Sequence, residues 1–285
     1  MGAVARNQDD INRYNLTDAE FKELSSIIYK DTGIFIDESK RQLIYRRISV
    51  RLKNLGMSSF SEYIDLVKTR DPAETEIFQN TITTNLTSFF RESHHFDFLR
   101  ESIVPEILTS NKLSEKLRIW SAGCSTGQEP YSIAITLREA FPEIDRWDAK
   151  VLCTDLDTEV LQKCKSGVYS RKDVANLPND YSSRWFDTVA NESERAVVAK
   201  QSLKDILFFK QLNLMDEWKM RGTFDVIFCR NVVIYFDKPT QKRLMERFSD
   251  YLVTGGYLVL GHSESLQGAK DRFELIGKTI YKKIK

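Results

Sequence analysis

Residues 15–90 carry hydrophobic positions at helical spacing between short polar connections. Thr17 and Glu20 have the spacing of a capping box, and apolar residues recur every three or four positions from there to Gly33, which can end a helix. Further helices are predicted at about 39–55, after Ser59 and after Asp71. We therefore expect an all-helical N-terminal domain over 15–90, preceded by a flexible tail at 1–14.

Beyond residue 90 the pattern changes to alternating strands and helices. After a long helix near 92–109, strands are predicted at 117–121, 151–154, 206–212, 224–229 and 257–260. The run at 224–229 is almost wholly apolar, as expected for a strand covered on both faces. This alternation indicates a doubly wound α/β sheet, which we assign to residues 91–285.

Residues 166–205 interrupt this alternation. The stretch is too long for one crossover and contains aromatic and β-branched residues such as Trp185 and Val197. We interpret it as an inserted subdomain with a few antiparallel strands and short helices. A disordered insertion is the alternative.

Glycines and polar residues cluster just after the predicted strand ends. They are Gly123, Gly127, Asp155, Asn213, Arg230 and Asn231. In an open parallel sheet, ligands bind outside the carboxyl ends of the strands at the point where strand order reverses. The glycines would let the backbone pass close to a ligand, although turn formation alone also explains them. Asp155 is placed to accept hydrogen bonds from ribose hydroxyls, so the combination favours a nucleoside ligand.

The sequence lacks the glycine fingerprint of dinucleotide binding and the phosphate-binding GxxxxGK[ST] loop. Glu129 instead stands at the predicted helix start, where a carboxylate would repel phosphate but suit the amino group of a methionine moiety. This points to S-adenosylmethionine. An ordinary acid favoured by the helix dipole is the alternative reading of Glu129.

Composition narrows the class of protein further. The formal net charge of the 285 residues is +1, so no global field draws the chain to nucleic acid or to an anionic membrane. We find neither an apolar run of about 20 residues that could span a membrane nor a signal-peptide core. The four cysteines lack CxxC spacing and the three histidines lack a zinc-ligand pattern. We expect a cytoplasmic protein with reduced thiols and no metal site.

Four strings together resemble one known family. TTNLTSFFRE at 83–92, SAGCSTGQEPYS at 121–132, FCRNVVIYFD at 228–237 and GHSE at 261–264 are similar to sequences of the CheR family of chemotaxis receptor methyltransferases. The resemblance spans nearly the whole chain. It implies a helical N-terminal domain, an S-adenosylmethionine-binding α/β domain with a small inserted β-subdomain, and methyl-ester formation on receptor glutamates for chemotactic signal transduction.

The resemblance also implies site residues. The implied cofactor contacts are Asn85, Thr87, Arg91, Gly123, Glu129, Asp155, Asn213, Leu214, Arg230 and Asn231. Asp155 would take the ribose, Asn213 and Leu214 would flank the adenine, and Arg91 and Glu129 would face the methionine end. Arg91 and Tyr235 are the implied catalytic pair that positions the incoming carboxylate. Some relatives carry a second acid where this chain has Gln128, which leaves the role of Glu129 intact.

Such a reaction needs no general base, because a glutamate with a pKa near 4.3 is already anionic at neutral pH. The sulfonium cofactor activates the methyl group. The protein must desolvate and align the carboxylate, and such positioning can supply roughly 7–11 kcal/mol. A planar arginine such as Arg91 is a suitable guide.

The second predicted helix is strongly basic, with Arg46, Arg47, Arg51 and Lys53 on it and no acid from 39 to 61. Such runs are usually solvated faces, but the resemblance supplies an acidic partner, the glutamate-bearing helices of a chemoreceptor. We expect these four residues to bind it.

In some family members the inserted subdomain docks a receptor peptide through a glycine-containing loop. The matching stretch, 186–195, has no glycine, which puts that docking in doubt; a monomer is expected.

Three other functions are less consistent with the sequence. GHSES at 261–265 is similar to an esterase nucleophile elbow, but Ser265 replaces the second glycine. A methyltransferase fold that binds S-adenosylmethionine or S-adenosylhomocysteine as a non-enzymatic adaptor is opposed by the intact Arg91 and Tyr235. A nucleic-acid or small-molecule methyltransferase is opposed by the neutral charge and the helical domain.

Overall fold

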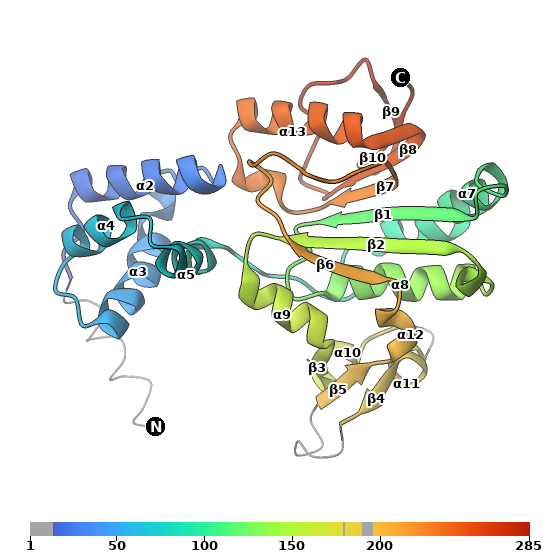
Figure 1. The fold of residues 1–285 in the computed structure, drawn as a ribbon, viewed down its shortest axis with the longest axis horizontal. Coiled ribbons are helices and arrows are strands. Elements are labelled where there is room, and N and C mark those ends of the chain that lie inside the picture. The colour runs from blue at the N-terminus through green and yellow to red at the C-terminus, as the bar shows by residue number, and fades with distance from the viewer. Residues whose placement is uncertain (1–13, 179, 190–195) are drawn as a thin grey trace. The chain divides into compact units, whose positions relative to one another are not determined.

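The computed structural model describes residues 14–178, 180–189 and 196–285, and the chain divides into two compact units (Figure 1). The first unit runs to Thr84 and also contains Tyr235–Asp237, and the second holds Asn85–Ile234 and Lys238–Lys285. The division falls at 84/85, whereas the sequence pattern placed it at 90/91. Of the expected tail at 1–14, only Tyr14 is described, and it is buried.

The first unit is all-helical, as its periodicity predicts. Its helices are α2 (Asp18–Thr32), η1 (Glu38–Lys40), α3 (Arg41–Leu55), α4 (Phe60–Lys68) and α5 (Pro72–Ile82). Thr17 and Glu20 form the predicted capping box of α2, and Gly33 ends it in a left-handed conformation. Ser59 and Asp71 cap the starts of α4 and α5.

The core of the first unit is mostly apolar, but among the described residues it also contains the buried polar side chains of Thr32 and Ser49 and one buried acid. Leu24, Ile48 and Phe78 are fully buried there. Glu74 is buried as well, and its carboxylate accepts hydrogen bonds from Tyr63 Oη at 2.8 Å and Arg51 Nε at 3.0 Å. Since a buried charge is tolerated only when paired and hydrogen-bonded, Arg51 and Tyr63 make Glu74 compatible with this core.

Tyr235–Asp237 belongs to the first unit although it lies far along the chain. The backbone N–H of Phe35 donates to Tyr235 O at 2.8 Å, and Ile34 forms an antiparallel bridge with Phe236. Tyr29 Oη donates to Asp237 at 3.0 Å. The helical unit is therefore built from two separate stretches of sequence.

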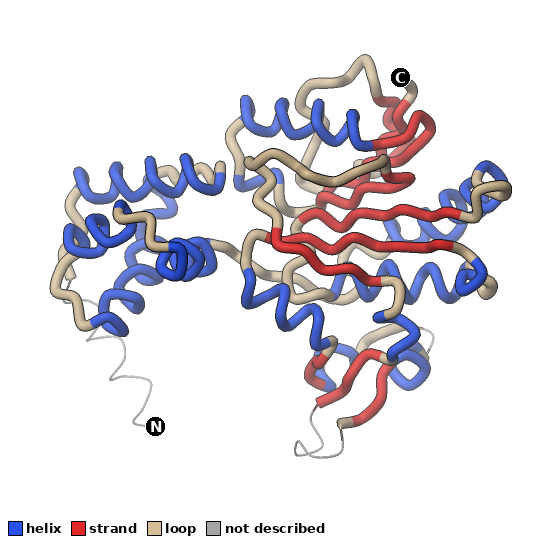
Figure 2. Tube along the Cα trace, viewed as in Figure 1, coloured by secondary structure: helices blue, strands red, loops and turns tan. Residues whose placement is uncertain are grey.

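The second unit contains a seven-stranded sheet in the order β6-β2-β1-β7-β8-β10-β9. Figure 2 shows its strands in red, with helices beside them in blue. Its strands are β1 (Lys116–Ala122), β2 (Asp148–Asp155), β6 (Leu207–Gln211), β7 (Phe224–Cys229), β8 (Leu252–Leu260), β9 (Phe273–Gly277) and β10 (Ile280–Lys283). The first five in sheet order are parallel, and β10 and β9 are antiparallel. This is the expected doubly wound α/β sheet.

Helices flank this sheet. They are α6 (His94–Phe98), η2 (Leu99–Ile103), α7 (Val104–Ser110), α8 (Gln128–Ala140), η3 (Ile144–Arg146), α9 (Thr158–Ser166) and α13 (Lys238–Tyr251). The short helix η4 (Val233–Tyr235) ends at Tyr235, which belongs to the first unit. α8 and α9 pack beside β2, and α13 packs beside β8. The long helix predicted at 92–109 is real but has a π-helical middle, η2. Pro105 follows directly and has no N–H to donate, so the regular ladder is interrupted there.

A second, three-stranded antiparallel sheet interrupts the large one, in the order β3-β5-β4. Its elements are β3 (Val168–Ser170), α10 (Arg171–Val174), α11 (Tyr181–Trp185), β4 (Phe186–Thr188), β5 (Ala196–Ala199) and α12 (Gln201–Lys204). It is the small β-subdomain expected within 166–205. Most of the glycine-free stretch at 186–195 lies outside the described residues.

Among the described helices, none combines the length and the apolar character that crossing a lipid bilayer demands.

Candidate active site

The loops that follow β1, β2 and β7 meet at the carboxyl edge of the parallel strands. β1 pairs with β2 on one side and β7 on the other, with Ala122 opposite Thr154 and Ser121 opposite Phe228. The strand order reverses between β1 and β7, since β2 and β6 lie on one side and β7 and β8 on the other. Such a reversal is where open α/β sheets bind ligands.

The loop between β1 and α8 depends on two glycines. Gly123 and Gly127 have φ values of 87° and 101°, a conformation that favours glycine. A Cβ on Gly123 would lie 2.3 Å from Val232 Cγ2, and one on Gly127 would lie 2.4 Å from Tyr169 Oη. These neighbours are protein atoms, so turn geometry and packing already require both glycines. The predicted close passage of Gly123 to a ligand stays a prediction.

Asp155 ends β2 beside this loop. Its carboxylate accepts backbone N–H bonds from Ser125 at 2.8 Å and Asp157 at 3.1 Å. Burial raises the pKa of Asp155 to about 6, against the lowering effect of these N–H donors. Asn85 joins the same loop, because its Nδ2 donates to Asp157 at 2.8 Å and its carbonyl accepts from Ser125 Oγ at 3.2 Å.

Glu129 and Arg230 form a buried ion pair in this unit. Glu129 lies in the first turn of α8 and accepts from Ser121 Oγ at 2.8 Å and from Arg230 Nη1 at 3.0 Å. Burial raises the pKa of Glu129, and the charge of Arg230 opposes that rise. The buried Nε of Arg230 has no hydrogen-bond partner among the described residues. An orphaned donor of this kind fits a ligand that brings an acceptor, such as the carboxylate of a methionine moiety.

Glu92 joins three segments of the second unit. Its carboxylate accepts from His262 through the backbone N–H at 3.0 Å and lies 2.8 Å from His262 Nδ1. It also lies 3.4 Å from Arg230 Nη2 and 3.4 Å from Asn231 Nδ2. Burial opposes ionisation, but His262 and Arg230 outweigh it and hold the pKa of Glu92 at about 2.

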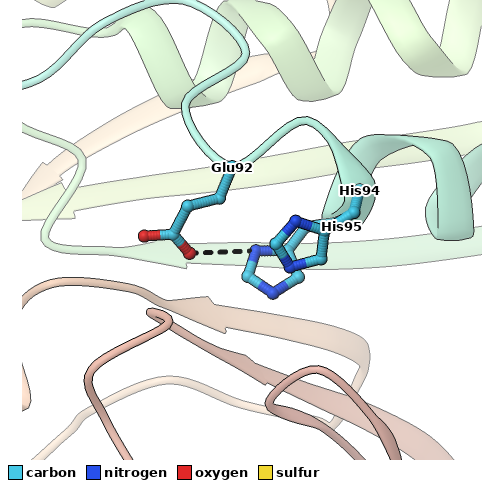
Figure 3. Close-up of side chains that lie close together, drawn as sticks. All are labelled: Glu92, His94 and His95. Carbon is cyan, nitrogen blue, oxygen red and sulfur yellow. Dashed lines mark ion pairs between the residues drawn. The ribbon is translucent and has the colours of Figure 1, made fainter.

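Glu92, His94 and His95 lie together, with one possible ligand atom from each within 4.8 Å of the others (Figure 3). His95 is buried, with Nδ1 3.5 Å from Glu92 and Nε2 3.0 Å from the Lys278 carbonyl. Burial and the charge of Arg230 lower the pKa of His95 to about 4, so the ring is neutral at pH 7. These are metal-binding residue types that lack zinc spacing in the sequence. Arg230 and His262 already engage the Glu92 carboxylate, and the buried Nδ1 of His95 has no hydrogen-bond partner among the described residues.

The remaining predicted cofactor residues of this unit lie at partly or fully buried loop positions. Arg91 Nη1 donates to Leu86 O at 3.0 Å, and the Arg91 carbonyl accepts from Arg230. Asn213 accepts from the backbone of Met215 at 3.0 Å, and Leu214 is buried. Two further residues, Thr87 and Asn231, are partly buried.

Tyr235, the predicted partner of Arg91, lies in the first unit. Lys40 Nζ lies 5.9 Å from the centre of its ring. Its role beside a substrate carboxylate stays a prediction.

The basic helix α3 divides its charges between two faces. Arg47 donates to Ile82 O at 2.5 Å and Thr84 Oγ1 at 3.0 Å, and Arg51 is bound to Glu74. Arg46 and Lys53 are exposed instead. The absence of acids at 39–61 suggested four solvent-facing cations, but Glu74 on α5 lies outside that window. Arg47 and Arg51 therefore have structural roles, and partner binding by any of the four stays a prediction.

Sequence reasoning missed the interactions of two acids, the buried Glu264 and the partly buried Glu92. Both stand in the quoted motif strings, Glu92 at the start of the helix predicted near 92–109 and Glu264 after the last predicted strand. A glutamate is usually exposed, and only the tertiary partners of these two distinguish them.

Two family models match the chain over adjoining ranges. The model described as CheR methyltransferase, SAM binding domain, matches residues 85–282. The model described as CheR methyltransferase, all-alpha domain, matches residues 19–83.

Similar curated proteins cover nearly the full chain. A probable chemotaxis protein methyltransferase of Rhizobium etli is 42% identical over 258 residues, which span 90% of this chain and 96% of that protein. The chemotaxis protein methyltransferase of Escherichia coli is 40% identical over 94% of this chain and 92% of its own. That of Borreliella burgdorferi is 39% identical over 97% and 99%.

Proposed function

Because the chain belongs to the CheR methyltransferase family, we propose that it transfers the methyl group of S-adenosylmethionine to glutamate side chains of chemoreceptors. The observation that carries this proposal is the joint match to the all-alpha and cofactor-binding domains, together with relatives near 40% identity over nine-tenths of the chain. The products are a glutamate methyl ester and S-adenosylhomocysteine.

The residues at the carboxyl edge of the sheet fit this cofactor. Asp155 would accept hydrogen bonds from the ribose hydroxyls, and Asn213 and Leu214 would flank the adenine. The Glu129–Arg230 pair offers one charge for each charged group of the methionine moiety, an amino group and a carboxylate. When bound, the sulfonium supplies an activated methyl group. Asn85, Thr87, Gly123 and Asn231 complete the proposed cofactor contacts.

The protein's own task is to present an anionic carboxylate. Arg91 and Tyr235 are proposed to orient it, since a guanidinium fork and a phenol hydroxyl both donate hydrogen bonds to carboxylate oxygens. Exclusion of water strengthens these bonds, and the aligned carboxylate oxygen attacks the methyl carbon without prior loss of a proton.

The proposed partner is the acidic methylation helix of a chemoreceptor. We propose that the protein binds it in the cytoplasm and as a monomer. Arg46 and Lys53 are exposed on α3 and can attract such a helix. Arg47 and Arg51 would act indirectly, because they bind Ile82 and Glu74 and so fix the position of α3.

Transfer of a tritiated methyl group to purified receptor signalling domains tests the proposal. We expect base-labile incorporation that disappears when the acceptor glutamates are replaced by alanine, and calorimetric binding of S-adenosylhomocysteine. Incorporation into RNA, or base-stable incorporation, would contradict it. Cofactor binding without any transfer would favour the adaptor function instead.

A further inference from the structure

Glu264 is a buried acid, outside the proposed cofactor contacts, whose carboxylate accepts three backbone N–H hydrogen bonds. It lies just after β8 and is 4% exposed. Oε2 accepts the backbone N–H of Asn231 at 2.9 Å and of Gly261 at 2.6 Å, and Oε1 accepts that of Ile234 at 3.2 Å. One side chain thus binds both ends of the loop after β7.

All of these partners are donors. A carboxylate can accept at both oxygens, whereas an amide in its place would turn an NH2 group toward one set of N–H donors. Burial raises the pKa of Glu264, and the backbone N–H groups of Gly261 and Asn231 oppose that rise. The geometry fits the ionised form, because a proton on either oxygen would face another donor.

The loop from Asn231 to Ile234 has a strained backbone that contacts from outside the loop must stabilise. Asn231 has a φ of 59°, an uncommon conformation for a residue with a side chain. A Cβ on Gly261 would lie 2.6 Å from Asn231 Nδ2 and 2.9 Å from Glu264 Oε2, so the segment after β8 approaches this loop as closely as glycine permits. Strained loop residues persist only where their surroundings fix them.

We propose that Glu264 is a positioning residue whose carboxylate fixes the backbone of the loop from Asn231 to Ile234. This inference rests on the proposed function, in which Arg230 and Asn231 hold the cofactor at one end of the loop and Tyr235 follows its other end. Glu264 touches neither cofactor nor substrate in this account. It acts by restricting the loop to few conformations, so that Arg230, Asn231 and Tyr235 are already in position before cofactor and substrate bind.

The test compares E264Q with E274Q in the full-length protein. Glu274 is exposed on β9 and serves as the matched control. Without the carboxylate, buried N–H groups of the loop lose their acceptor and the loop becomes less ordered. We therefore expect E264Q to bind S-adenosylhomocysteine about 10- to 100-fold more weakly than the wild type, and E264A to do the same. E274Q should bind like the wild type.

Hydrogen exchange separates positioning from general stability. In E264Q the amides of Asn231 and Ile234 should exchange faster while those of β1 and β7 stay protected. Uniformly faster exchange through the second unit would overturn the proposal in favour of a merely structural role. Wild-type affinity and loop protection in E264Q would overturn it as well. A wild-type protein that fails to bind S-adenosylhomocysteine would instead contradict the proposed function. In that case, hydrogen exchange in E264Q would still show whether the Glu264 carboxylate fixes the backbone of the loop.

Discussion

Arg230 Nη1 lies 3.0 Å from Glu129 Oε2, and this buried pair joins the loop after β7 to the first turn of α8. Ser121 and Arg91 add hydrogen bonds to its two ends. The pair therefore connects the two loops on either side of the point where strand order reverses. Stability and cofactor binding should depend on it together.

Replacing Arg230 by alanine should lower the free energy of unfolding by about 3–5 kcal/mol, because Glu129 is left as an uncompensated buried charge. The double variant R230A/E129Q should recover part of that loss, since it removes the stranded charge. Urea denaturation of the three proteins measures both effects. Equal stability of the single and double variants would show that the charge is not what matters.

Cofactor affinity should fall in mild acid. The folded pKa of Asp155 is raised to about 6, so the carboxylate becomes protonated as the pH drops through that value and can no longer accept from both ribose hydroxyls. Affinity for S-adenosylhomocysteine should weaken toward about tenfold per pH unit below pH 6. Asp157 is the neighbouring acid, and D155N should bind weakly with little dependence on pH between 5 and 7. Calorimetry in matched buffers measures this.

The stability contribution of Asp155 has the opposite sign. Its folded pKa lies above the unfolded value near 3.9, so the neutral form is favoured by folding. Unfolding free energy is lost as the pH rises from about 4 through 6, and D155N should remove that loss. Denaturation midpoints at pH 5 and pH 7 check the sign.

Charge reversal at Arg46 and Lys53 should slow receptor methylation at low receptor concentration. Both are exposed on α3, and an acidic partner helix would then meet like charges. The effect should shrink at high salt, because exposed charges are screened. Affinity for S-adenosylhomocysteine and the melting temperature should match the wild type. An unchanged methylation rate would show that this face does not meet the receptor.

Charge reversal at Arg51 should instead unfold the helical unit. R51E places a second acid against buried Glu74, and the cost should be on the order of 3–5 kcal/mol. The swap R51E/E74R offers a partial rescue. Thermal melting followed by circular dichroism measures it, with R46E as the surface control.

Replacing Arg91 by alanine should reduce turnover at saturating cofactor and receptor by about tenfold or more, because a hydrogen bond to the reacting carboxylate is lost. The Arg91 carbonyl that accepts from Arg230 is backbone and survives the change. Near-normal kcat would remove Arg91 from the catalytic role.

The sequence predicted best those elements that depend on residues close together in the chain, such as helix caps and apolar strands. The capping box at Thr17, the cap at Asp71 and the apolar strand β7 all lie where the pattern placed them. The hairpin of β9 and β10 was not predicted. β9 is mostly exposed and β10 is only four residues long, so neither shows clear alternation. The hairpin joins the sheet because β10 pairs with β8 on one side and with β9 on the other.

The contacts that the sequence did not predict join residues that are far apart along the chain. Glu74 lies 23 residues from Arg51, and Glu264 lies 33 residues from Asn231, so no local window reveals either contact. The glycines at 123 and 127 were recognised as turn positions. Their close neighbours, Val232 and Tyr169, became apparent only in three dimensions.

The helical unit is completed by Tyr235–Asp237, so a contiguous stretch of the chain does not contain all of it. A chain that ended at Thr84 would leave the N–H of Phe35 and the hydroxyl of Tyr29 without the acceptors they have in the full protein. During synthesis on the ribosome, the N-terminal helices emerge well before residue 235 is made. Their last contacts can therefore form only after most of the sheet has been translated, which ties the maturation of one unit to the other.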